Sequence, residues 1–139
     1  MAAKRIQAIA KIKDPEKMLA PEDLLHFVEL DGFVDEWESF KPNVETDLEQ
    51  LMIGIMANPQ AAPVIKGTGG LRKLRFSPDK MRIGKSGAFR VCYAYFEEHW
   101  IVMLITVYKK GQTDTLDAAD KKAIRDLILE TKKYLDERN

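Results

Sequence analysis

Hydrophobic and polar positions repeat with two different periods along the chain, and each period predicts a type of secondary structure. Between 43 and 58, apolar residues recur three or four positions apart, which is typical of one buried face of a helix. The segments 71–76 and 89–96 have patterns typical of strands. In the first, apolar and polar residues alternate, and the second is rich in aromatic and β-branched residues. The full pattern predicts a strand at 26–30, helices at 32–40 and 43–58, strands at 71–76, 89–96 and 100–108, and a last helix that Asp117 caps, with a stripe of Ala123, Ile124, Leu127, Ile128, Thr131 and Leu135.

The segment 100–108 is the most hydrophobic part of the chain. It is apolar at nearly every position, as expected of a central strand that is covered on both sides. Only Glu97, Glu98 and His99 separate it from the preceding strand, so an antiparallel hairpin is predicted. The order of elements therefore predicts an α+β domain, in which two N-terminal helices and a C-terminal helix pack on an antiparallel twisted sheet.

Residues 1–25 differ from the rest and are predicted to be an N-terminal extension, either flexible or with a short helix at 4–13 before Pro15. Residues 26–139 are predicted to form one domain. No run of eighteen apolar residues occurs, so no membrane span is expected, and the predicted compartment is the cytoplasm. Cys92 is the single cysteine, and His26 and His99 have no ligand partner at metal-binding spacing, so neither a metal nor a cofactor is expected.

The net charge of zero conceals a strong local asymmetry. Residues 29–50 contain eight acids and one base, whereas residues 66–90 contain eight bases and one acid. Because a partner responds to the local potential, the second segment favours binding of a polyanion. The acidic segment is either a solvated helix face or a surface that repels polyanions.

Several of the basic residues fall on predicted strands. A period of two places Lys73 and Arg75 on one face of their strand and Arg72 on the other. Arg90 begins the next strand, on which Tyr93 and Tyr95 share a face, and Lys109 ends the third. These side chains form either a nucleic-acid surface or an ordinary solvated sheet face. The glycines after Lys66 lack the spacing of a phosphate-binding loop and favour a tight turn.

Taken together, four segments resemble a known family. They are Asn58-Pro59, Val64-Ile65-Lys66-Gly67-Thr68-Gly69-Gly70-Leu71-Arg72-Lys73-Leu74-Arg75, Gly84-Lys85-Ser86-Gly87 with Phe89-Arg90-Val91 and Tyr93, and Leu104-Ile105-Thr106-Val107-Tyr108-Lys109-Lys110. In this order they resemble the HigB-like branch of the RelE/ParE toxins of type II toxin–antitoxin systems, over about residues 26 to 130.

The resemblance implies a RelE-like, microbial-ribonuclease-like fold and a bacterial mRNA interferase that inhibits translation. Such a toxin is an endoribonuclease, a hydrolase that cuts mRNA in the ribosomal A site, and its partners are the ribosome, mRNA and a cognate antitoxin protein. Catalytic positions correspond to Lys73, Arg75, Arg90 and Lys110, and RNA-binding positions to Arg72, Lys85 and Tyr93, to which the basic surface adds Lys66, Tyr95 and Lys109. The sequence departs from RelE at Lys110, which replaces an arginine, and at Leu116, which replaces a tyrosine.

A histidine-free mechanism is the hypothesis for these residues. The ribose 2′-OH attacks the adjacent phosphate, while Arg75 and Arg90 stabilise the added negative charge. Lys73 is the candidate general base, and Lys110, or Tyr93 if it lies close, the candidate acid. The alternatives are a ParE-like inhibitor of DNA gyrase, a non-catalytic nucleic-acid-binding domain and a decayed toxin that binds only its antitoxin.

Overall fold

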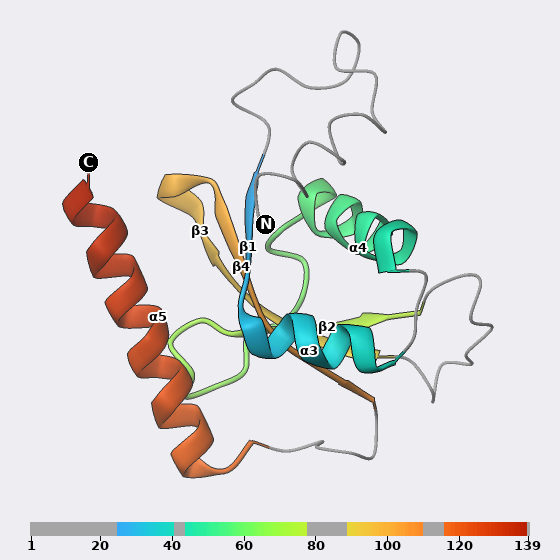
Figure 1. Cartoon of the computed structure of the whole chain (residues 1–139). Helices are drawn as coiled ribbons and strands as arrows, with labels where there is room; N and C mark the ends of the chain where they lie inside the picture. Colours follow the sequence, from blue (N-terminus) through green and yellow to red (C-terminus); the bar gives the residue numbers. More distant parts are fainter. Residues whose placement is uncertain (1–24, 41–43, 78–88, 110–115, 139) are drawn as a thin grey trace, which may run out of the picture.

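A four-stranded sheet lies between helices on its two faces in the computed structural model of the chain, which describes residues 25–40, 44–77, 89–109 and 116–138 (Figure 1). The elements, in order, are β1 (His26–Glu29), α3 (Asp31–Ser39), α4 (Val44–Ala57), β2 (Arg72–Phe76), β3 (Phe89–Phe96), the short 3₁₀ helix η4 (Glu97–His99), β4 (Ile101–Lys109) and α5 (Ala118–Arg138). The predicted α+β order is confirmed. The predicted helix at 4–13, Lys85 and Lys110 lie outside the described residues.

The strands are arranged in the order β1-β4-β3-β2. β2, β3 and β4 pair antiparallel, as predicted, whereas β1 pairs parallel to β4. β4 therefore has a strand on each side, and its residues contribute to the apolar clusters on both faces of the sheet, which explains its apolar sequence. Between Cys92 and Tyr93 the register with β4 shifts by one residue, because Cys92 lies opposite Thr106 and Tyr93 lies opposite Leu104. This bulge turns the end of the hairpin that contains Arg90 and Tyr108.

One face of the sheet packs against α3 and α4. Leu48, Leu51, Met52 and Ile55 are buried there, which confirms the apolar stripe predicted for α4. Trp37 of α3 is only 2% exposed, and its ring lies 6.0 Å from that of Phe76 and 6.3 Å from that of Phe89. Because Phe76 and Phe89 are register partners, this one side chain fixes α3 against β2 and β3 together.

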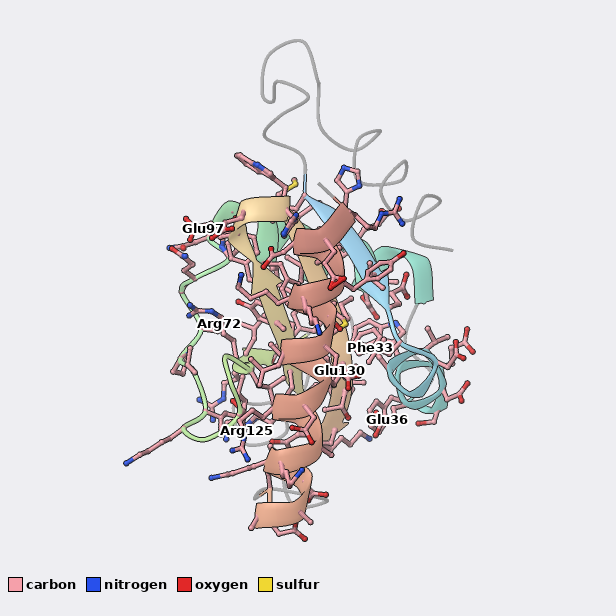
Figure 2. All side chains as sticks on the ribbon, turned by 90° about the vertical axis from the view of Figure 1, so that its left-hand side faces the viewer. Phe33, Glu36, Arg72, Glu97, Arg125 and Glu130 are labelled. Carbon is pink, nitrogen blue, oxygen red and sulfur yellow. The ribbon has the colours of Figure 1, made fainter. Side chains whose placement is uncertain are left out.

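The opposite face packs against α5, which lies lengthwise over the strands (Figure 2). The Asp120 amide donates to the Asp117 carboxylate at 2.7 Å, so the predicted N-cap is confirmed. Ile124, Leu127, Ile128 and Leu135 belong to the apolar cluster on this side of the sheet. Ala123 is exposed, so its predicted place in the buried stripe of α5 is wrong. The stripe that packs on the sheet is narrower than the hydrophobic pattern of the sequence suggested. None of the described helices has the length and hydropathy needed to cross a bilayer.

The glycine-rich loop before β2 is the tight turn that the sequence predicts. Gly67 and Gly69 have φ angles of 85° and 74°, which side chains rarely tolerate. The Thr68 hydroxyl donates to the Ile65 carbonyl at 2.6 Å and accepts the Leu71 amide at 3.0 Å, which closes the turn. Arg125 of α5, which is labelled in Figure 2, donates to the Gly67 carbonyl at 2.9 Å. The loop is thereby held against α5, and it leads directly into the basic strand β2.

Candidate nucleic-acid interface

Three of the predicted catalytic residues lie together at the outer edge of the sheet. Arg75 of β2 is the register partner of Arg90 of β3, and Lys73 is the partner of Cys92, two positions further along the same face. Lys73, Arg75 and Arg90 line one hollow of ≈ 480 Å³, whose other wall is Leu74 and residues 61–63. The convergence that sequence reasoning left open is therefore observed for these three side chains.

The geometry of this group suits a phosphate. Arg75 and Arg90 lie directly opposite each other in the ladder, where like charges repel. Each guanidinium presents a planar fork of donors that can grip two oxygens of one phosphate and stays charged at any physiological pH. Lys73 adds a third cation from the neighbouring position on the same face. A chain of phosphates that follows the β2 edge would meet all three.

Sequence reasoning missed two residues that the fold brings to the same face. Tyr108 is the register partner of Arg90, so a phenol lies beside that guanidinium on the sheet. Glu36 belongs to α3 and lies at one border of the sheet, whereas Arg72 lies at the opposite border (Figure 2). Its carboxylate accepts the Thr106 hydroxyl at 2.7 Å and the Val107 amide at 3.4 Å. The family motif includes Tyr108, but only as a residue of a predicted strand. No sequence pattern relates Glu36 to β4.

Cys92 is the register partner of Lys73, and its thiol is buried. Burial raises the pKa of the thiol from 9.0 to about 11, although the nearby Lys73 ammonium and a hydrogen bond with Tyr108 act in the opposite direction. A thiol with this pKa is not a nucleophile near neutral pH.

We expect iodoacetamide at pH 8 to alkylate Cys92 at least ~100-fold more slowly in the folded chain than in urea, since a pKa two units higher leaves about a hundredth of the thiolate. Mass spectrometry reports this residue alone, because the chain has one cysteine. Equal rates in the two states would show that the thiol is open to solvent.

Arg72 and Tyr93 lie on the other face of the sheet from Lys73. The Arg72 guanidinium donates to the carbonyls of Gln60 at 2.9 Å and Ala62 at 2.7 Å. The Tyr93 hydroxyl donates to the Pro59 carbonyl at 2.8 Å, and burial raises its pKa, with Arg72 opposing this. Both side chains hold the loop after α4 against the sheet, which gives them a structural role. The condition that Tyr93 lie close to Lys73 is not met.

The remaining predicted RNA-binding residues are dispersed. Tyr95 is half-buried on the α4 face, and burial, followed by the Glu97 carboxylate, raises its pKa. The Lys109 ammonium lies 5.3 Å from the centre of the Phe40 ring and 5.9 Å from that of Phe89, also on that face. Lys66 is exposed in the glycine loop beside α5. The structure thus brings together Lys73, Arg75 and Arg90, and places Tyr93 and Tyr95 on the opposite face of the sheet.

No known protein family's sequence profile matches the chain. Among solved structures, it is similar to an arginine-substituted variant of the E. coli toxin RelE in the free state, with 15% identity and a TM-score of 0.47 over 73% of this chain and 94% of that one. It is also similar to the intact E. coli RelBE toxin–antitoxin complex, with 17% identity and a TM-score of 0.46 over 63% of this chain and 96% of that one. The isolated E. coli RelE toxin gives 17% identity and a TM-score of 0.46, covering 73% and 96%. These similarities are in the path of the backbone.

Proposed function

We propose that the chain is the toxin of a type II toxin–antitoxin module, of the HigB-like branch, and that it cleaves mRNA on the ribosome. The observation that supports this most directly is the single hollow lined by Lys73, Arg75 and Arg90. These are three of the four positions at which the sequence resembles the catalytic residues of RelE-type toxins. The ordered motif from Val64 to Arg75, which includes two of these three residues, adds support from the sequence.

The proposed reaction is an in-line transfer within the RNA. The ribose 2′-oxygen forms a bond to the adjacent phosphorus, the bond to the 5′-oxygen breaks, and the products are a 2′,3′-cyclic phosphate and a 5′-hydroxyl. Arg75 and Arg90 grip the non-bridging oxygens and stabilise the additional charge of the transition state. Lys73 receives the proton of the 2′-hydroxyl, and Lys110 returns a proton to the leaving oxygen.

The ribosome has a defined part in this mechanism. A few cations without a histidine are a weak catalytic set, and much of the barrier must be removed by holding the 2′-oxygen, phosphorus and leaving oxygen in line. The hollow at the β2 edge is shallow and open on the outside, so it grips a phosphate without orienting the nucleotides on either side. A message stretched in the decoding centre would supply that orientation. The antitoxin, by this proposal, blocks toxicity by binding the toxin domain.

The test is primer extension on a translated message in a purified translation system, with the full chain and its Lys73→Ala and Arg90→Ala variants. New 5′ ends within codons that depend on ribosomes are expected for the unchanged chain, and both variants should lose them. For Lys73→Ala, single-turnover cleavage should fall far more than ribosome binding. An intact message with translation still running would overturn the proposal and would favour gyrase inhibition or simple nucleic-acid binding.

A further inference from the structure

A second cluster of chemically active side chains lies at the other end of the hairpin, where η4 meets the C-terminal end of α5 (Figure 1). Glu98, His99 and Asp136 each offer a ligand atom there, and these atoms all lie within 4.8 Å of one another. The His99 Nε2 atom is 2.7 Å from the Asp136 Oδ1 atom, and the His99 side chain is 9% exposed. The three residues belong to two elements that are distant in the sequence, so no motif spacing reveals them.

The first strand brings a second imidazole to a hollow beside this cluster. The His26 amide donates to the Trp100 carbonyl at 2.7 Å, which positions the start of β1 beside the hairpin tip. His26, Glu98 and His99 line one hollow of ≈ 460 Å³. The chain has only two histidines, and both of them line this hollow.

We propose that Glu98, His99 and Asp136 bind a zinc ion or a similar divalent transition metal, with water in the remaining position and His26 in the adjoining hollow. Imidazole nitrogen and carboxylate oxygen are the ligands that such ions take in proteins, at about 2.0–2.2 Å and in tetrahedral geometry. Donor atoms that already lie within 4.8 Å reach that geometry by small side-chain rotations of groups near the surface.

The metal-free arrangement prepares the carboxylate for this role. Two neighbours, His99 and Lys132, hold the Asp136 carboxylate in place by hydrogen bonds. The Lys132 ammonium lies 2.9 Å from the Oδ2 atom, on the oxygen that His99 does not contact. The ion would take the place of the proton shared by His99 and Oδ1, while Lys132 continues to orient the carboxylate.

The expected consequence is a clamp between the hairpin tip and the end of α5. The Phe96–Ile101 pair closes this end of the hairpin, whereas Arg90 and Tyr108 pair near the other end, roughly 20 Å away along the strands. The metal would therefore stabilise the packing of α5 without touching the basic hollow. This inference does not depend on the proposed RNA cleavage, and either can fail alone.

Zinc sulfate added to the tag-free, EDTA-treated full chain tests the proposal by isothermal titration and thermal melting. We expect one ion per chain with a dissociation constant in the micromolar range, and a Tm rise on the order of 10 °C when free zinc is 100-fold above that constant. His99→Gln, which can still donate to Asp136, and Asp136→Asn should each weaken binding by about 100-fold or more while leaving the circular dichroism of the metal-free chain unchanged. Glu130→Gln, which removes an exposed carboxylate from the same helix, should leave zinc binding unaltered.

Absence of one-to-one zinc binding at tenth-millimolar concentrations would overturn the proposal. So would binding that survives in the His99→Gln variant. Both outcomes are readable because the chain has no imidazoles besides His26 and His99, and its one thiol is buried.

Discussion

The Arg90→Ala variant is expected to cleave ribosome-bound message about 10²–10³-fold more slowly than the unchanged chain in single-turnover reactions. Arg90 is the central member of the basic cluster, since its register partners are Arg75 on one side and Tyr108 on the other. In the proposed mechanism, its removal takes away a bidentate phosphate grip that strengthens as the attacking oxygen adds charge to the phosphate. Ribosome binding should weaken less than about tenfold, because one phosphate contact is a small part of a large polyanionic interface.

Two further substitutions make this result specific. Arg90→Lys keeps the charge and loses the planar fork, so its cleavage rate should lie between those of the unchanged chain and Arg90→Ala. Arg138→Ala removes an exposed arginine from the far end of α5 and should cleave at the original rate. If Arg90→Ala lost binding and cleavage to the same extent, Arg90 would only hold the RNA. If it cleaved normally, the hollow would not be the reaction site.

Much of the fold could be predicted because it depends on local patterns. The buried stripe of α4 and the extended segment β3 follow from hydrophobic periodicity and from enrichment in strand-forming residues. The Asp117 cap is likewise a matter of a few neighbouring residues. Alternation also separated Lys73 and Arg75 from Arg72, since the side-chain period of a strand is two whatever its neighbours are.

The relation between strands could not be predicted, and the site depends on it. Alternation shows that Tyr93 and Tyr95 share a face, but only the pairing of Arg72 with Tyr93 shows that it is the face opposite Lys73. Because one residue of slip moves every side chain to the other side, the sequence alone could not decide this. Glu36 and the Glu98–His99–Asp136 cluster are further examples, since each joins elements that only tertiary packing brings together.

Trp37→Ala is expected to lower the free energy of unfolding by about 3–5 kcal/mol, a large part of the ~5–15 kcal/mol typical of a domain. The reason is that Trp37 is fully enclosed and packs on Phe33, Phe76 and Phe89, so its removal leaves a cavity between α3 and the strand pair. The Tm should fall by on the order of 15 °C. Trp37→Phe should cost only about 1–2 kcal/mol, because the buried indole Nε1 atom has no hydrogen-bond partner among the described residues and its loss leaves nothing unsatisfied.

Urea unfolding followed by circular dichroism measures these differences, and Trp100→Ala is the matched control. Trp100 is 44% exposed at the hairpin tip, so its truncation should change the free energy of unfolding by less than about 1 kcal/mol. The pair of variants also connects stability to the site. Phe76 and Phe89, on which Trp37 packs, are the strand neighbours of Arg75 and Arg90, so loosening this contact should reduce cleavage in proportion to the loss of folded chain. Unaltered stability in Trp37→Ala would mean that α3 does not fix the strand pair, and the rigid placement of the two arginines would then need another cause.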